Sequence, residues 1–511
     1  MHTLSSIYKK YRIECWLIAA GIIVVGAFGA VQWVFLTTPE STPIRGIQPN
    51  NMVFIHLLGM PLDDVYIHCR YSNNLLHGFS YSFNPGETLT ADTSPLWVLL
   101  IAFGGLFTTH LELVAIGLSI ASYLLIAPGI YRMSRDVFAL SERNARLAGW
   151  IAVLCSRLAW SAMSGMETAL AALLMLLVVE QHVRDRERKC LWAREAIWLG
   201  LALLLRPEFL FVAFVIAIDW IYAWVKKRAD ISRAPIVILL LIVIASPAFL
   251  LPLMTSNSLI SHSSVVQGAR MSWIPNFAYP WFALKVLASN NIILFLLFIT
   301  GLCFLHGDRK YRIPYFIALG LPILQAFVAP QFRQHGRYFF PVFPIVIIIG
   351  IAAWNRMRQI GLIGRIVPVL ILLAGVAETG RWAVIEAESA RNINDQHLAV
   401  VDWLKTNLKP SDTLAMDDIG AIGYYLNRPV IDLTGLVTPA IWPLEHDQDS
   451  VWRAARSMGA NVFIIYRRLN PTFYQEHQDS LILQRDFPVR LPLTSAADTV
   501  MSIYRLRSNG S

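Results

Sequence analysis

Two adjacent carboxylates, Asp63 and Asp64, open the most polar stretch of an otherwise apolar region of the sequence. Neighbouring acids that are partly removed from water repel each other, which raises the pKa of one of them. Such a carboxylate can act as a general base and take a proton from a hydroxyl group. The pair could instead cap a helix expected over 65–77, which Gly78 would end. Because neighbours on a helix point about 100° apart, one carboxylate can cap while the other faces a cleft.

Three further residues in the same stretch could support a base. Tyr66 and Arg70 fall within two helical turns of Asp64, and Glu87 ends an Asn-Pro-Gly-Glu turn. Arg70 is a candidate ligand for a phosphate group, because a guanidinium group can bind phosphate through two parallel hydrogen bonds. Tyr66 and Glu87 are candidates for supporting the substrate or a metal ion.

Ionisable residues also occur where three apolar segments end or break. Such residues at membrane depth are costly and are functional candidates by default. Singly, each group has a simpler explanation, such as helix capping, pairing within the group or contact with lipid head groups. Together they fit a lipid-phosphate substrate, because cations could hold the phosphate while a carboxylate activates an acceptor hydroxyl. The groups are Glu167 in a Gly-Met-Glu-Thr turn, Arg206 and Glu208 on either side of Pro207, and Arg333, His335 and Arg337 before an apolar run.

The composition of the chain places these residues in a membrane protein. Of its 511 residues 56% are hydrophobic and 15% are charged, whereas soluble domains carry about 25% charged residues, so a water-soluble globular enzyme is excluded. The five cysteines are scattered without disulfide or zinc-site spacing. The sequence also lacks G-x-x-x-x-G-K-[ST], H-E-x-x-H and G-x-S-x-G, so nucleotide hydrolysis, zinc-protease and α/β-hydrolase chemistry have no support.

About eleven segments are expected to form membrane helices, since a bilayer core about 30 Å thick needs about 20 apolar helical residues. The run 195–225 is too long for one helix and contains Pro207, so we expect two short helices there. The other expected segments are 15–35, 113–133, 147–163, 169–183, 234–253, 292–305, 313–328, 339–354 and 366–382.

Positive charge between these segments predicts their orientation. About half of the 43 Lys and Arg residues fall on one side of the expected bilayer, and cytoplasmic loops carry such an excess. We therefore expect a multi-pass protein with a cytoplasmic N-terminus. The single N-x-[ST] acceptor, at Asn509, favours a bacterial plasma membrane. The net charge of +9 then needs no nucleic-acid partner. The clusters lie at 9–12, 132–146, 184–194, 226–233, 309–312 and 356–365.

Two regions are expected on the extracytoplasmic face. The first loop, 37–112, includes an apolar stretch at 94–107 that is too short to span and would lie in the membrane interface. The tail, 383–511, is long enough for one small soluble domain that follows a polytopic α-helical module over 1–382. Its pattern predicts an α/β fold, with a helix at 400–408 and strands at 413–416, 430–433 and 461–466.

Taken in order, the motifs resemble those of the GT-C membrane glycosyltransferases. They begin at Asp63 with D-D-V-Y-I-H-C-R-Y-S-N-N-L-L-H-G, continue through N-P-G-E, T-S-P-L, S-G-M-E-T, L-R-P-E and H-G-R-Y-F-F-P, and end at Val437 with D-D-I-G-A-I-G-Y-Y-L-N-R-P-V-I-D-L-T-G-L-V. They are most similar to the branch that includes the terminal arabinofuranosyltransferases of the mycobacterial envelope. The sequence departs from that branch at Ala91-Asp92, where relatives often carry a Gly-aromatic pair.

The resemblance implies an inverting glycosyltransferase that acts outside the cytoplasm. Its donor would be a sugar, such as arabinofuranose, carried on polyprenyl phosphate, and its acceptor a cell-envelope glycan or glycolipid. A divalent cation, Mg²⁺ or Mn²⁺, could assist, held by Asp63, Asp64 and Glu167. By the same resemblance, the base is Asp63 or Asp64, Glu167 is the acidic residue of the second outer loop, and Arg333, His335 and Arg337 contact the phosphate.

Two alternatives stay open on the sequence alone. A transporter of lipid-linked sugars or other solutes would use the same charges to line a path, although such charges should be distributed through the bilayer rather than gathered on one face. A non-catalytic relative that binds glycolipid would keep the same motifs.

Overall fold

The computed structural model describes residues 2–37, 59–87, 89–256, 258, 261–262, 274–305, 307–328, 330, 332, 334–357, 363–444, 446–489, 493 and 498–507. The chain divides into two compact units. We call Met1–Phe28, Ile116–Ala248 and Arg270–Ala383 the helical unit, and Gly29–Ala115, Phe249–Ala269 and Val384–Ser511 the sheet unit.

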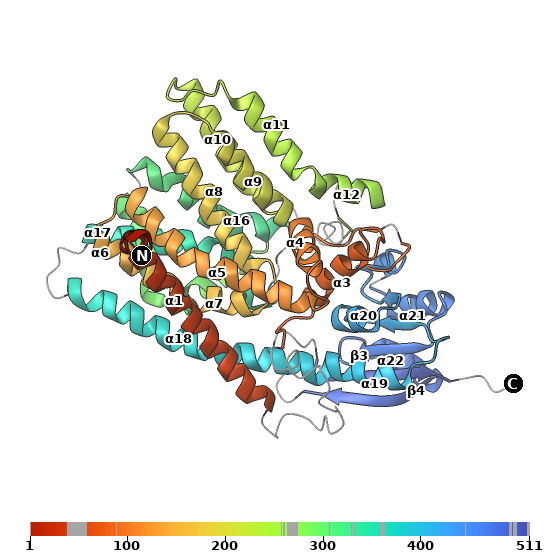
Figure 1. Ribbon diagram of the computed structural model, residues 1–511. Coiled ribbons are helices and arrows are strands. Elements are labelled where there is room, and N and C mark those ends of the chain that lie inside the picture. Colours follow the sequence, from red (N-terminus) through yellow and green to blue (C-terminus); the bar gives the residue numbers. More distant parts are fainter. Residues whose placement is uncertain are drawn as a thin grey trace. The chain divides into compact units, whose positions relative to one another are not determined.

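The helical unit is built from long apolar helices (Figure 1). Four of its helices, α1, α5, α12 and α18, also supply residues to the sheet unit. The helices are α1 (His2–Thr37), α5 (Leu111–Asp136), α6 (Glu142–Val153), α7 (Ser156–Met163), α8 (Thr168–Arg188), α9 (Ala193–Leu205), α10 (Phe209–Val225), α11 (Ala234–Ala245), α12 (Pro247–Ser256), α14 (Ala278–Asn290), α15 (Ile292–Leu305), α16 (Arg309–Val328), the 3₁₀ helix η1 (Gln334–Val342), α17 (Phe343–Met357) and α18 (Ile363–Ile393).

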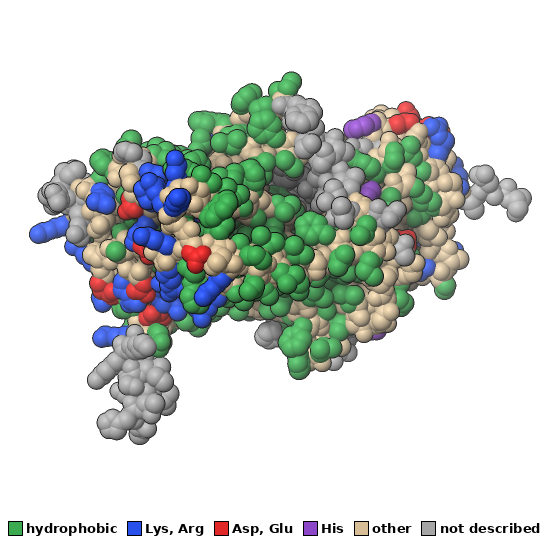
Figure 2. Space-filling model, turned by 90° about the horizontal axis from the view of Figure 1, so that it is seen from above, with side chains coloured by type: hydrophobic (Ala, Val, Ile, Leu, Met, Phe, Trp, Pro, Cys, Tyr) green, Lys and Arg blue, Asp and Glu red, His purple; other side chains and the backbone are tan. Residues whose placement is uncertain are grey.

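Five helices in the described part of the chain are long and apolar enough to cross a membrane. The pair α11 and α12 covers the expected segment 234–253 and passes the same test as a unit, but it is bent by 44° and so forms either a broken sixth span or a re-entrant loop. Large apolar side chains on α10 and α11 are exposed, as expected of helices that face lipid: Phe214, Ile218, Ile236 and Leu239. Lys and Arg side chains gather at one end of the face shown in Figure 2, beside a broad hydrophobic surface. The chain is therefore a helical membrane protein with several candidate spans.

The expected segment 147–163 is not one helix. It breaks after α6, and Cys155 takes an extended conformation before α7 begins. The side-chain oxygen of Asn290 accepts hydrogen bonds from Ser156 Oγ at 2.9 Å and from the Arg157 backbone N–H at 3.4 Å. A distant amide thus bonds one backbone N–H that the start of α7 leaves unpaired, together with a neighbouring hydroxyl, which stabilises the break inside apolar surroundings.

The break expected at Pro207 is present. Arg206 is extended, with φ −154° and ψ 135°, between α9 and α10. Proline disfavours the helical conformation of the residue before it, so α9 has to end there. The turn places Arg206 at the end of α9 and Glu208 at the start of α10.

The sheet unit contains a five-stranded mixed sheet in the order β2-β1-β3-β5-β4. Strands β1, β2 and β3 run parallel, and β5 pairs antiparallel with both β3 and β4. The elements are α3 (Asp64–Leu76), α4 (Pro95–Gly105), the π-helix η2 (Asn394–Leu398), α19 (Ala399–Asn407), β1 (Leu414–Met416), α20 (Gly420–Leu426), β2 (Val430–Asp432), η3 (Trp442–Leu444), α21 (Gln448–Ser457), β3 (Val462–Tyr466), α22 (Pro471–His477), η4 (Gln478–Ser480), β4 (Leu481–Pro488) and β5 (Val500–Leu506).

Most of the secondary structure expected in this unit is confirmed. The first-loop helix is α3, with Gly78 at φ +76° beyond its end, and the apolar stretch at 94–107 contains α4. In the tail, α19, β1, β2 and β3 match the expected helix and strands to within two residues at either end. The antiparallel pair β4 and β5 was not predicted.

The first loop and the tail share one hydrophobic core. Tyr71 and Phe83 from the loop are buried in the same cluster as Ile422, Val430 and Ile464 from the tail. Helix α3 lies beside α20 (Figure 1). The aspartate pair is therefore held by residues more than 300 positions further along the chain.

Candidate active site

Asp63 occupies the position just before α3, but its carboxylate does not cap that helix within the described residues. It points at the start of α20 instead. Oδ2 accepts a hydrogen bond of 2.7 Å from the backbone N–H of Gly420, and Oδ1 accepts one of 2.8 Å from that of Ala421. The expectation that this carboxylate caps the first-loop helix is therefore wrong for Asp63, because its oxygens bind the N–H groups at the start of α20 instead.

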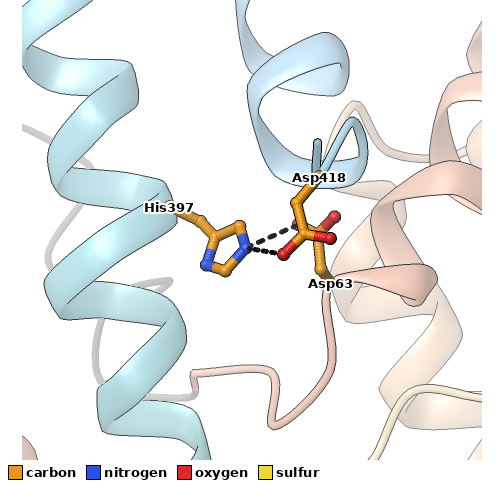
Figure 3. Close-up of side chains that lie close together, drawn as sticks. All are labelled: Asp63, His397 and Asp418. Atoms are coloured by element: carbon orange, nitrogen blue, oxygen red, sulfur yellow. Dashed lines mark hydrogen bonds and ion pairs between the residues drawn. The ribbon is translucent and has the colours of Figure 1, made fainter. Parts of the chain in front are cut away.

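A histidine and a second aspartate complete a cluster around Asp63 (Figure 3). Nε2 of the buried His397 lies 3.0 Å from Oδ2 of Asp418 and 3.9 Å from Oδ1 of Asp63. The hydroxyl of Tyr466, at the end of β3, donates to the same Asp418 oxygen at 2.9 Å. Asp418 follows β1, so the cluster lies at the carboxyl ends of two neighbouring parallel strands, where open α/β sheets commonly place their sites.

Burial governs the electrostatics of this cluster. It raises the pKa of Asp63 from 3.8 to about 6, an effect that the charge of His397 opposes and that Asp418 and Asp64 strengthen. Asp63, His397 and Asp418 each present one ligand atom, and the three atoms lie within 4.8 Å of one another. The same atoms are joined by hydrogen bonds and ion pairs, which account for their arrangement without an ion.

Asp64 differs from its neighbour in exposure. It is the first residue of α3 and is half-buried, whereas Asp63 is 9% exposed. Four residues further on, on the same side of the helix, the Nδ1 atom of His68 lies 2.8 Å from a carboxylate oxygen of Asp92. Asp92 also accepts hydrogen bonds from the Tyr81 hydroxyl and the Ser94 backbone N–H. Asp92 therefore orients His68, one helical turn beyond Asp64.

Arg70 and Tyr66 are built into the core. The fully buried Arg70 donates from Nε to the carbonyl oxygen of Phe83 and from Nη1 to the side chain of Asn427. Tyr66 packs its ring against those of Tyr424 and Tyr425, with centroids 6.0 Å and 5.5 Å away. These contacts hold α3 against α20, and neither side chain reaches the surface.

The remaining first-loop candidate, Glu87, is exposed. Its carboxylate accepts a hydrogen bond of 3.1 Å from the side chain of Asn84. Asn84 in turn pairs with both the N–H and the carbonyl group of Val430, at 3.0 Å each, and so extends the edge of β2. The Asn-Pro-Gly-Glu turn thus joins the first loop to the sheet.

Four other predicted residues come together within the helical unit. Arg206 lies between two carboxylates, with Nε 2.6 Å from Glu208 Oε1 and Nη1 3.7 Å from Glu167 Oε1. Its guanidinium group lies 5.0 Å from the centre of the Tyr338 ring, and that of Arg337 lies 5.3 Å from the centre of the same ring. Both arginines are at most 5% exposed. Two cations therefore share one aromatic ring beside two acids, a setting that can hold an anionic group without a large net charge.

His335 lies in a strained turn next to this group. Both His335 and Gly336 have positive φ, at 58° and 75°. The imidazole meets the rings of Trp160 and Trp382 edge-on, with centroids 5.5 Å and 5.1 Å away. Strained backbone of this kind persists where its surroundings fix it. Arg333, the other cation predicted here, lies outside the described residues.

One buried cation in this unit was missed. The guanidinium group of Arg157 stacks on the Trp382 ring at 3.7 Å, and its Nη1 atom donates to the carbonyl oxygen of His335 at 3.1 Å. Arg157 is 6% exposed and holds the turn that carries His335. The sequence does contain a signal for Arg157, because this arginine interrupts an expected membrane segment, where a charged residue is a functional candidate by default.

Comparisons with known proteins agree with the fold. Residues 391–504 match the model of a domain of unknown function, DUF8728. No curated protein sequence matches the chain. The crystal structure of ArnT from Cupriavidus metallidurans bound to undecaprenyl phosphate is similar over 96% of this chain and 98% of that chain, with a TM-score of 0.63 and 12% identity.

Two further solved structures resemble the chain. One is the archaeal oligosaccharyltransferase AglB from Archaeoglobus fulgidus, in complex with an inhibitory peptide and a dolichol-phosphate. The match covers 90% of this chain and 70% of the AglB chain, with a TM-score of 0.53 and 13% identity. The other is the arabinofuranosyltransferase AftD from mycobacteria. The match covers 97% of this chain and 40% of the AftD chain, with a TM-score of 0.46 and 12% identity. The ArnT and AglB structures have the GT-C fold, so the GT-C fold expected from the motifs is confirmed.

Proposed function

We propose that this protein is an inverting glycosyltransferase that moves a sugar from a polyprenyl-phosphate donor to a cell-envelope glycan or glycolipid. The observation that carries the proposal is the pair of buried arginines, Arg206 and Arg337, around Tyr338, in a fold shared with a protein crystallised with undecaprenyl phosphate. Arabinofuranose is the sugar that the motifs favour.

In the proposed reaction, a first-loop carboxylate, Asp63 or Asp64, accepts the proton of an acceptor hydroxyl. The acceptor oxygen forms a bond to the anomeric carbon, while the bond between that carbon and the phosphate oxygen breaks. The electron pair leaves with the polyprenyl phosphate, and attack opposite the leaving group inverts the anomeric centre. Because the phosphate is already a fair leaving group, the protein mainly positions the reactants and stabilises charge.

Arg206 and Arg337 are the proposed ligands of the departing phosphate. Guanidinium groups bind phosphate through paired N–H donors, and burial strengthens that attraction. Glu167 and Glu208 hold Arg206 in place before the charge develops. Arg70 has no such role in the proposal, because it is fully buried among first-loop and tail residues.

The proposal includes a topology. Eleven spans would place the N-terminus in the cytoplasm of a bacterium and the first loop and the tail outside its plasma membrane, as the distribution of Lys and Arg favours. Single cysteines introduced at Gln478 and Arg228 test it, because these residues would lie outside and inside, respectively. A membrane-impermeant maleimide should label whole cells at the first position only.

The direct test is sugar transfer by purified protein in detergent, with a radiolabelled polyprenyl-phosphate sugar and a short glycan acceptor. We expect release of polyprenyl phosphate together with a glycoside of inverted configuration. Arg206→Gln should abolish transfer, whereas Arg146→Gln should not, because Arg146 is exposed and its ion pair with Glu142 lies at the surface. Donor binding without consumption would favour a transporter or a non-catalytic binding protein.

A further inference from the structure

The helical unit contains a cavity at the end where α6 and α18 begin and α17 ends. Its volume is about 490 Å³, within the range of about 300–1,000 Å³ that is usual for small-ligand sites. The first residues of α6 form the polar wall, and Trp354 of α17 and Pro368 of α18 add apolar surface. None of the lining residues belongs to the candidate active site described above.

A buried hydrogen bond fixes two walls of this cavity. Helix α6 packs beside α17 (Figure 1), and the side-chain amide of Asn144 donates to Oδ1 of Asn355 at 2.6 Å. Asn144 and Trp354, both of which line the cavity, are each 3% exposed. The space is therefore enclosed by firmly packed helix ends.

The lining of the cavity carries a net positive charge. Its ionisable residues are Glu142, Arg143 and Arg146. Nε of Arg146 lies 2.7 Å from Oε1 of Glu142, so these two charges balance each other. Arg143 is exposed, and no ion pair joins it to a carboxylate in the described part of the chain. Its guanidinium group is thus available to an anion, and such groups bind phosphate through paired N–H donors.

Two indole rings line the same cavity. Trp150 is 39% exposed, whereas Trp354 is almost fully buried. Tryptophan is enriched where a membrane meets water, because its ring is apolar and its N–H group is a hydrogen-bond donor. An arginine together with two tryptophans therefore suits a ligand that has an anionic head and an apolar remainder.

An apolar face of α18 begins beside the cavity. Pro368 lines the cavity, and four large apolar side chains around it in the sequence are 43–60% exposed. They recur three and four residues apart, so they share one side of the helix. A lipid whose head group occupies the cavity can lay its acyl chains along this side. The exposed side chains are Ile366, Val369, Leu370 and Leu373.

We propose that this cavity binds the head group of an anionic phospholipid, with Arg143 as the ligand of the phosphate and Trp150 and Trp354 as apolar walls. Basic pockets between membrane helices on the cytoplasmic side bind head groups of this kind, because the cytoplasmic leaflet carries anionic lipids. The topology proposed above places the cavity in that leaflet. The site itself does not depend on sugar transfer.

The test measures the unfolding temperature of the full-length protein in dodecyl maltoside, with added dioleoylphosphatidylglycerol or dioleoylphosphatidylcholine. A ligand that binds the folded protein raises this temperature as its concentration rises. The anionic lipid should raise it more than the zwitterionic lipid does. In Arg143→Gln the affinity for the anionic lipid should fall about tenfold or more, because hydrogen bonds to a charged group are lost.

Two further variants locate the effect. Trp150→Ala should also weaken the response to the anionic lipid, because it removes an apolar wall of the cavity. Arg188→Gln is the matched control, since Arg188 is an exposed cation at the end of α8 that does not line the cavity. It should respond to lipid as the wild-type protein does. Each variant is compared with its own unfolding temperature without lipid.

The outcomes decide between this site and simpler explanations. Equal stabilisation by the two lipids would overturn the proposal, as would equal losses in Arg143→Gln and Arg188→Gln, which would indicate diffuse attraction to the basic end of the protein. Stabilisation by free glycerol phosphate as strong as that by the lipid would assign the cavity to a soluble phosphate. If Arg143→Gln does not fold, the comparison of Trp150→Ala with Arg188→Gln still decides. A failure of the proposed sugar transfer would leave these results unchanged.

Discussion

The carboxylate of Asp63 accepts a hydrogen bond of 2.7 Å from the backbone N–H of Gly420, which lies 357 residues further along the chain. Contacts so distant in sequence lose much conformational entropy when they form, and they persist where many others form with them. Here Arg70 with Asn427 and Asn84 with Val430 join the same two segments. The first loop depends on the tail for its conformation.

Replacing Gly420 by alanine should therefore destabilise the sheet unit. The added methyl group would meet Asp63 at 2.3–2.4 Å, and forcing such a group into a packed site costs about 1–3 kcal/mol. We expect a lower unfolding temperature in detergent. Gly380→Ala is the matched control, because a Cβ atom there meets nothing within 4 Å and alanine favours helix. Equal unfolding temperatures for the two variants would contradict the contact.

The raised pKa of Asp63 predicts how stability depends on pH. Because its pKa in the folded protein, about 6, lies above the ordinary 3.8, the folded state holds this proton more tightly than the unfolded state. The contribution is complete below pH 4 and is lost as the pH rises through 6. Asp63→Asn cannot ionise, so its unfolding temperature should fall less than that of the wild-type protein between pH 4.5 and pH 7.

A substitution of His397 gives a second test of this pH dependence of stability. Its charge lowers the pKa of Asp63, so His397→Gln should raise that pKa further and move the loss of stability to higher pH. Thermal unfolding between pH 5 and pH 8 would show the shift. An unchanged profile would mean that the imidazole carries no charge beside Asp63.

The tail shows what sequence patterns can predict. Strands β1, β2 and β3 are fully buried and rich in apolar residues, so they stand out between polar turns. Strand β4 lies at the edge of the sheet, and most of its residues are exposed. An irregularity between Leu483 and Arg485 also interrupts its alternation. Edge strands of this kind lack the pattern by which strands are recognised.

The candidate site was predicted only in part, because charged residues stand out in the sequence beside apolar segments but not within a polar segment. Asp63, Glu167, Arg206 and Arg337 attract attention because charge is unusual beside apolar segments. His397 and Asp418 lie in a polar tail, where charge is ordinary. Their partner is more than 330 residues earlier, and no local pattern links a side chain to a contact at that distance. The break at Cys155 was missed in the same way, since its cause, Asn290, lies on another helix.

Chelation should distinguish a metal ion bound in the cluster of Asp63, His397 and Asp418 from a cation that Asp64 or Glu167 holds during the reaction. Hydrogen bonds and ion pairs account for the cluster of Asp63, His397 and Asp418, so EDTA should leave the unfolding temperature of the protein unchanged. A fall in that temperature, reversed by Mn²⁺, would instead place an ion in the cluster. Loss of transfer alone, restored by Mg²⁺ or Mn²⁺, would indicate that Asp64 or Glu167 holds a cation during the reaction.

Arg337→Lys tests the phosphate role of the arginine pair most sharply. Lysine keeps the positive charge but loses the planar group that lies over Tyr338 and the paired donors that fit a phosphate. Removing one donor that stabilises developing charge typically lowers kcat by about 10²- to 10³-fold, and we expect a loss within that range. Arg146→Lys, on the exposed side of α6, should keep wild-type kcat. Unfolding temperatures within a few degrees of the wild-type value would exclude a general loss of structure. A role for Arg337 in packing alone would give the opposite pattern, with a lower unfolding temperature and normal kcat.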